Sequence, residues 1–242
     1  MGDLYGFGIY VGEIARIRIR IHWILLVMWF LDLQNAMQGG EGARSARISG
    51  WVLGVLISFG SILLHEFGHC LAARKVGGFA DEVLLWPFGG LAFCACPDFW
   101  KAHLIVAVGG PLVTVAICGV SYGTFALLHE YAAGPWMHTR LHDLAYFYLV
   151  YWNFFILIFN MVPIYPMDGG RILHSLLWGW FSRRSGYLWG GKSLASRLTL
   201  NISRVAAAGG IIYGISTRNL PMTFIFVWAW MQSEQLNRNV VW

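Results

Sequence analysis

The stretch LLHEFGHCLAAR, residues 63–74, places ionisable side chains inside an apolar segment. That segment runs from residue 48 to residue 73, and Glu66 is its only Asp, Glu, Lys or Arg. An apolar helix of roughly 20 residues crosses the hydrocarbon core of a bilayer, so the segment predicts a membrane-spanning helix. Inserting a carboxylate there costs on the order of 2.5 to 3.5 kcal/mol, which indicates that Glu66 has a function.

Similar apolar segments occur along the rest of the chain. They cover residues 21–40, 102–129, 144–167, 198–217 and 219–233. The chain is 57% hydrophobic and 12% charged, whereas a soluble domain carries roughly 25% charged residues. This composition excludes an ordinary soluble protein, a disordered chain and a nucleic-acid-binding protein. We expect an all-α polytopic membrane protein with six transmembrane helices, forming a single domain over residues 1–242.

The basic residues are distributed unevenly between the two sides of these predicted helices. All but four of the 17 Lys and Arg residues fall on one side, and the exceptions are Arg44, Arg47, Arg140 and Arg218. Lys and Arg accumulate on the cytoplasmic side of membrane proteins. Both termini are therefore predicted to be cytoplasmic.

Two stretches near the predicted cytoplasmic interface do not follow a helical pattern. Residues 14–21, IARIRIRI, alternate arginine with isoleucine, which is typical of a strand with one polar and one apolar face. Residues 79–93 contain Pro87 and the Gly89-Gly90 pair between apolar residues, which predicts a bent strand or a hairpin. We expect a small β element at this interface. The four cysteines are too few for a disulfide framework and are expected to be reduced.

The polar residues of the second predicted helix form the pattern HExxH, with His65, Glu66 and His69. Helix positions four apart lie about 40° apart around the axis, so both imidazoles can bind one Zn²⁺. Glu66, beside them, is placed to take a proton from a zinc-activated water. The composition gives a chance expectation of about 0.006 for this pattern. The alternative is a helix end whose polar side chains only reach the lipid headgroups.

A catalytic zinc has three protein ligands and one open position. The fourth predicted helix ends in FNMVPIYPMDGGRIL, residues 159–173, where prolines and glycines break the helix and leave Asp168 at the depth of the two histidines. From the residues alone, Asp168 is equally a third ligand or the cap of the following helix. His22, His103 and His174 lie near the same side, and each is expected to be an interfacial histidine.

HEFGH in one membrane helix and NMVPIYPMDGG at the end of another resemble the site-2 protease family of intramembrane zinc metalloproteases, peptidase family M50. The resemblance extends to IHW at 21–23, PFGG at 87–90 and GGP at 109–111. It implies one zinc ion held by His65, His69 and Asp168, with Glu66 as the catalytic base. It also implies that Asn160 helps to hold the substrate backbone, although an amide in an apolar helix equally fits a structural hydrogen bond.

The chain departs from the family pattern at two positions. Met167 replaces the usual leucine before Asp-Gly, which should matter little because the two side chains have similar volumes. Thr114 stands where relatives often have Asn, so an amide role is doubtful there. No stretch is long enough for a PDZ domain or a CBS pair, which predicts a minimal form of the family.

The resemblance implies hydrolysis of a peptide bond near the cytoplasmic face, in a single-pass membrane-protein substrate whose helix first unwinds. Regulated intramembrane proteolysis in the plasma (inner) membrane of a prokaryote is expected. An edge strand within residues 79–93 could hold the unwound segment by strand addition, or it could only plug the membrane face of the protein. The alternative functions are a membrane metal transporter, which would need metal-binding residues along a path through the bilayer, and an inactive scaffold.

Overall fold

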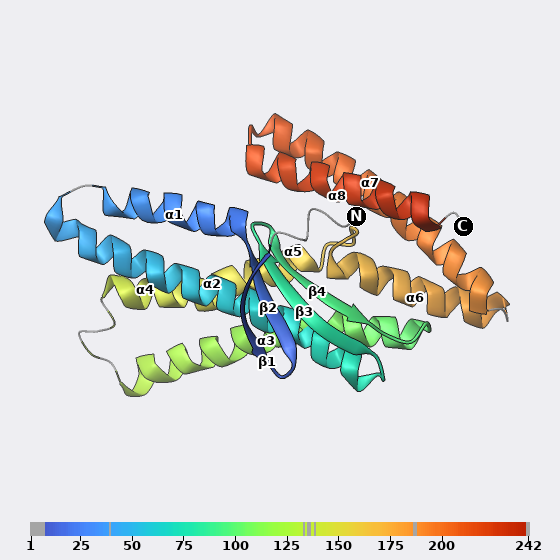
Figure 1. Cartoon of the computed structure of the whole chain (residues 1–242), viewed down its shortest axis with the longest axis horizontal. Helices are drawn as coiled ribbons and strands as arrows, with labels where there is room; N and C mark the ends of the chain where they lie inside the picture. The colour runs from blue at the N-terminus through green and yellow to red at the C-terminus, as the bar shows by residue number, and fades with distance from the viewer. Residues whose placement is uncertain are drawn as a thin grey trace.

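The computed structural model describes residues 8–38, 40–132, 134, 137, 139–185 and 188–240. Most of these residues are helical, and a small sheet packs against the helices (Figure 1). The strands are β1 (Gly8–Ile14), β2 (Ile17–His22), β3 (Phe79–Trp86) and β4 (Gly89–Ala95). The helices are α1 (Trp23–Met37), α2 (Glu41–Lys75), α3 (Trp100–Tyr131), α4 (Arg140–Tyr146), the π-helical η2 (Phe147–Trp152), α5 (Asn153–Asn160), α6 (Asp168–Ser185), α7 (Leu188–Ser216) and α8 (Leu220–Val240).

Four helical segments within the described residues are long and apolar enough to cross a membrane. They are Ala43–Lys75, Trp100–Tyr131, Arg140–Asn160 and Gly191–Ser216. The predicted mostly helical membrane fold is therefore confirmed, and four of the predicted helices are found. α1 is apolar but only 15 residues long, and α8 is not among the four. The number of six spans stays a prediction.

The helix predicted at residues 144–167 ends earlier than expected. α5 ends at Asn160, and the chain becomes helical again only at Asp168, where α6 begins. Pro163 and Pro166 lie in the interval. Proline has no N–H to donate and its ring crowds the preceding helical turn, so two prolines three residues apart strongly disfavour a continuous helix in this segment. The break separates α5 from α6 and places Asp168 at a helix start.

The sheet has the order β1-β2-β3-β4, with antiparallel pairs β1–β2 and β3–β4 and a parallel pair β2–β3. The strand predicted at residues 14–21 is corrected: β2 begins at Ile17, because Ala15 and Arg16 form a turn with positive φ. The hairpin predicted at residues 79–93 is confirmed as β3 and β4. Buried Ile17, Val83 and other sheet residues pack with Cys70 of α2, which fixes the sheet beside the HExxH segment.

The α2 and α3 helices approach each other so closely that only glycine fits between them. A Cβ on Gly109 would lie 2.5 Å from the carbonyl oxygen of Gly68, and a Cβ on Gly68 would overlap the Gly109 carbonyl. A Cβ on Gly110 would overlap the Nε2 atoms of His65 and His69. The GGP sequence of α3 therefore brings this helix directly against the two imidazoles.

The C-terminal helices form a second group. Figure 1 shows α7 and α8 side by side along the top of the view, with α6 below them. α6 packs against α3 and α7, and so it joins this group to the α2–α3 pair. Buried Ala207 of α7 and Ala229 of α8 pack with Ile164 and Met167, the residues that precede α6. The start of α6 is therefore supported from the α7–α8 side by apolar contacts.

Candidate metal centre

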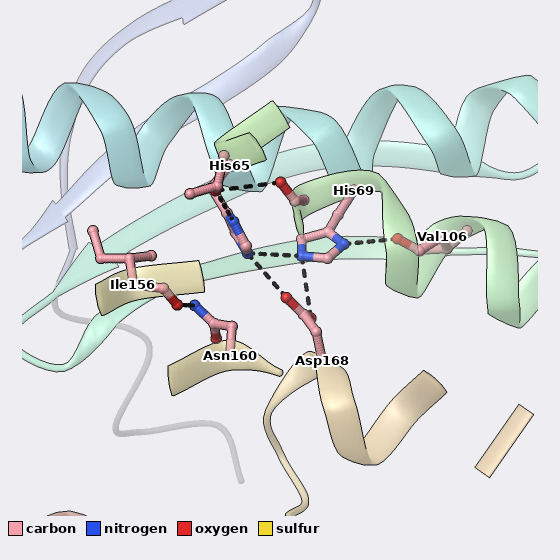
Figure 2. A network of polar contacts seen from close by, with 8 residues as sticks. His65, His69, Val106, Ile156, Asn160 and Asp168 are labelled. Atoms are coloured by element: carbon pink, nitrogen blue, oxygen red, sulfur yellow. Dashed lines mark hydrogen bonds and ion pairs between the residues drawn. The ribbon is translucent and has the colours of Figure 1, made fainter. Parts of the chain in front are cut away.

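The fold brings His65, His69 and Asp168 together (Figure 2). The Nε2 atoms of the two histidines lie 3.2 Å apart. His65 Nε2 lies 3.0 Å from Asp168 Oδ2, and His69 Nε2 lies 3.2 Å from Asp168 Oδ1. All three residues are at most 5% exposed. Helices α2 and α6, which are far apart in the sequence, therefore direct two imidazole nitrogens and one carboxylate at a common point.

The α3 helix contacts both imidazoles at Nδ1, the ring nitrogen that does not face Asp168. His69 Nδ1 lies 2.7 Å from the carbonyl oxygen of Val106, and His65 Nδ1 lies 2.8 Å from Oγ1 of Thr114. A carbonyl oxygen can only accept a hydrogen bond, so Nδ1 of His69 carries a hydrogen, and in the neutral imidazole Nε2 then has a free lone pair. The sequence did not predict either contact, because a backbone carbonyl leaves no signal and Thr114 had been assigned no role.

The arrangement of these atoms provides a test of whether a metal ion fits. In a neutral His69, the Nε2 lone pair faces a carboxylate oxygen of Asp168 and Nε2 of His65. Acceptors in mutual contact repel each other unless a cation lies among them, either a proton on an imidazole or a metal ion. Two imidazoles and one carboxylate form a typical donor set of catalytic zinc. The cluster fits one zinc ion.

The helix start at Asp168 bears on the two interpretations that the sequence left equal, a third metal ligand or the cap of α6. The backbone N–H groups of Gly170 and Arg171 donate to the carbonyl of Met167, at 3.1 and 3.3 Å. Met167 is therefore the N-cap residue of α6, and Asp168 is the first residue inside the helix. The Asp168 carboxylate faces the histidines instead. This geometry favours the ligand interpretation.

Glu66 lies beside the cluster, close to the backbone of β4. Its side chain is buried, and its carboxyl carbon would lie 2.7 Å from a Cβ placed on Gly90. Only glycine at position 90 allows the strand to pass so near the carboxyl group. The PFGG turn and the HExxH motif, separate in the sequence, therefore meet at Glu66.

A cavity of about 600 Å³ opens at the cluster. Residues of α1, α2, η2, α5 and α8 and of the β3–β4 turn line it, and Glu66, Asn160 and Arg171 are among them. The side-chain amide of Asn160 donates to the carbonyl of Ile156 at 3.0 Å (Figure 2). The structural hydrogen bond considered for Asn160 is thus present, in a residue that also borders the cavity.

Arg171 is the only Lys or Arg among the described residues that line the cavity. Burial lowers the pKa of its guanidinium, but Tyr165, Asp168 and Glu66 raise it, and the resulting pKa lies above the usual value. Arg171 therefore carries a positive charge. This charge balances part of the negative charge that Glu66 and Asp168 bring to the cavity.

The other candidate histidines lie outside the metal cluster found among the described residues. His22 caps α1 by accepting from the Ile24 N–H, and His103 pairs with Asp98 at 3.5 Å. Nε2 of His174 lies 2.9 Å from Oγ of Ser196, and burial lowers the pKa of His174 to about 4. Each has a local role. The four cysteines are free thiols, as predicted.

Comparison with known proteins gives a consistent picture. Residues 131–187 match the family model "Peptidase family M50". The chain is 28% identical over 192 residues to a zinc metalloprotease of Methanocaldococcus jannaschii, covering 78% of this chain and 51% of the relative. It is 30% identical over 175 residues to Rip3 of Mycobacterium tuberculosis, covering 69% of this chain and 43% of the relative. The chain thus spans about half the length of the curated relatives it matches.

The fold is also similar to a solved structure. The site-2 protease from Methanocaldococcus jannaschii aligns with a TM-score of 0.61 at 24% identity, covering 95% of this chain and 94% of that one. The similarity extends over nearly the whole of both chains, so the helices and the sheet described above form the same fold in the two proteins.

Proposed function

The chain belongs to peptidase family M50, and from this premise we propose that it is a zinc-dependent endopeptidase that hydrolyses peptide bonds within membrane-protein substrates. The observation that carries the proposal is the meeting of His65, His69 and Asp168 beside Glu66 at the wall of a cavity. These residues supply both requirements of metal-assisted hydrolysis, a metal site and an adjacent base.

In this proposal His65 and His69 bind the metal through Nε2, and Asp168 binds it through its carboxylate. These three residues would hold the ion, and three protein ligands are the number typical of a catalytic zinc site. Zinc held by these residues would supply Lewis-acid chemistry, polarising a scissile carbonyl and lowering the pKa of a water molecule. All three side chains are buried, so solvent screens their charges less than it would at the protein surface.

The Glu66 carboxylate is the proposed general base. It accepts a proton from the attacking water and then delivers it to the amine of the departing product. Its position directly after His65 on α2 keeps it next to the metal ligands, and Gly90 leaves room for it against β4. Glu66 thus links the metal centre to the strand at the edge of the sheet.

Substrate binding is proposed to use β4 and Asn160. β4 is one of the two terminal strands of the described sheet, so one of its edges faces away from β3. A helical substrate segment must unwind before cleavage, because its amides are engaged in their own hydrogen bonds, and an extended segment can add to a strand edge. Asn160 donates one N–H to Ile156, which leaves its oxygen to contact a substrate amide.

The proposed substrate is a single-pass membrane protein, cleaved near the cytoplasmic face in regulated proteolysis. If the chain has six spans, the distribution of Lys and Arg supports both termini in the cytoplasm. The plasma membrane of a prokaryote is the proposed location, with the lipid bilayer as the surrounding partner. The described residues contain one metal-binding cluster and not a series of them, which favours hydrolysis over metal transport.

Glu66→Gln tests the proposal directly. The amide keeps the shape of the side chain but cannot take up the proton, so zinc content should be unchanged while cleavage falls at least about 100-fold. Cleavage is measured on reconstituted single-pass transmembrane segments that carry a tag at each end, and zinc by mass spectrometry.

Glu130→Gln, at the exposed end of α3, is the matched control and should leave both quantities unchanged. Cleavage by Glu66→Gln at a rate near that of the parent would contradict hydrolysis through this residue.

A further inference from the structure

Thr114 is a buried polar residue in the middle of α3, one helical turn after Gly110. Its side chain is 1% exposed, and its Oγ1 lies 2.8 Å from Nδ1 of His65. The other nitrogen of this imidazole faces Asp168 and His69. Thr114 therefore contacts His65 on the side opposite to the proposed metal position.

The direction of the hydrogen bond follows from a second contact of the same hydroxyl. Thr114 Oγ1 also lies 3.4 Å from the carbonyl oxygen of Gly110, which can only accept. The hydroxyl hydrogen points to Gly110, so the Oγ1 lone pair is left to accept from His65 Nδ1–H. With its hydrogen on Nδ1, a neutral His65 presents a free lone pair at Nε2, as zinc binding requires.

The two histidines are held in the same way but by different groups. The partner of His69 is a backbone carbonyl, that of Val106, which no side-chain substitution removes. The partner of His65 is the hydroxyl of Thr114, which a single substitution deletes. Both partners come from α3, the helix that the Gly68–Gly109 contact brings against α2.

We infer that Thr114 is a positioning residue for His65: its hydroxyl holds the imidazole with Nε2 unprotonated and directed at the zinc site. The inference rests on the proposed function, because it concerns the same metal. Partners that orient a histidine ligand typically contribute about 10- to 100-fold to metal affinity. Removing the hydroxyl should weaken zinc binding by an amount in this range.

The test compares Thr114→Val, which keeps the branched shape without the hydroxyl, with Thr114→Ser, which keeps the hydroxyl. Zinc affinity of the full chain in detergent is measured by competition with a chromophoric chelator. Thr114→Val should bind zinc about 10- to 100-fold more weakly, and Thr114→Ser should stay within about 3-fold of the parent. Thr199→Val, the same change at a buried position of α7, should leave zinc affinity unchanged.

Each outcome has one interpretation. Equal zinc affinity of Thr114→Val and the parent would overturn the inference, and so would equal weakening in the Val and Ser variants, because packing would then be the cause. If Thr114→Val does not fold by circular dichroism, Thr114→Ala takes its place beside Thr114→Ser. Failure of the parent itself to bind zinc would contradict the proposed function, and is thereby distinguished from failure of the inference.

Discussion

The α2–α3 pair and the α7–α8 pair both consist of long, largely apolar helices, but different contacts hold them. In the first pair, backbone meets backbone at Gly68 and Gly109, and polar contacts fix two histidines. In the second pair, apolar residues pack together, and an ion pair joins Arg204 to Glu234 at 2.8 Å.

The two pairs also contribute differently to the cavity. The first supplies His65, His69 and Glu66, two proposed metal ligands and the proposed base, whereas α8 supplies apolar lining residues, Ile225 and Trp228. Phe88 of the β3–β4 turn, which lines the cavity, stacks on Phe224 of α8 with the ring centroids 5.3 Å apart, so the turn and α8 are in contact there. We therefore expect substitutions in α2 and α3 to change zinc affinity. Substitutions at the contact with α8 should instead change the cleavage of substrate.

The largest effect is expected for His65→Ala and His69→Ala. Each removes one of the three proposed ligands from a buried site, so stoichiometric zinc binding should be lost in both variants. Zinc per protein is measured by mass spectrometry after chelator dialysis. His129→Ala, near the exposed end of α3, serves as control and should retain the zinc. An unchanged number of zinc ions per protein in both variants would show that α2 does not supply metal ligands.

Asp168→Asn tests the contribution of α6. The Met167 carbonyl caps the helix, so the variant should stay folded, while zinc affinity should fall more than about 100-fold because the carboxylate charge is lost. Circular dichroism reports the fold, and chelator competition reports the affinity. Full zinc occupancy together with intact proteolysis would return the search for a third ligand to His22, His103 and His174.

Gly109→Ala tests the close contact of α2 with α3. The new methyl group would meet the carbonyl of Gly68, which cannot give way, so the helices must separate at a cost of about 1 to 3 kcal/mol. Thermal unfolding should occur at a lower temperature, and zinc affinity should also fall. Gly119→Ala, on the same helix but facing open space, should not destabilise the protein. Equal effects of the two changes would argue against the contact.

The smallest effect on the metal is expected for Phe88→Ala. It removes the stacking on Phe224, worth about 0.5 to 1.5 kcal/mol beyond area burial, and should alter cleavage of tagged transmembrane segments while zinc affinity stays the same. Phe154→Ala, at an exposed position of α5, is the control. A loss of zinc as large as in Gly109→Ala would show that the two helix pairs do not act separately.

The sequence predicted those features that depend on local geometry. The HExxH spacing places His65 and His69 on one face of any helix, and apolar length marks four of the membrane helices. The prolines of residues 159–173 predicted a break, but the exact end at Asn160 depends on how the segment packs. The start of β2 moved because Ala15 and Arg16 adopt positive φ, which is uncommon for residues other than glycine.

Features that depend on distant contacts could not be predicted in the same way. The choice between cap and ligand at Asp168 depends on α2, far away in the sequence, and on the Met167 carbonyl. The contact of Thr114 with His65 joins residues 49 positions apart. The one sign of this contact in the sequence is a threonine within an apolar helix. The same pattern fits a hydroxyl that donates a hydrogen bond only to a backbone carbonyl of its own helix.

The separation of His65 from Asp168, 103 positions along the chain, gives the metal a thermodynamic role besides chemistry. An ion that binds both residues closes a long loop and acts as a cross-link between the two halves of the chain. A ligand that binds only the folded state stabilises it by RT ln(1 + [L]/Kd), about 2.7 kcal/mol when the free ligand is at 100 times Kd. Zinc binding would therefore raise the free energy of unfolding of the protein in addition to supplying the proposed chemistry.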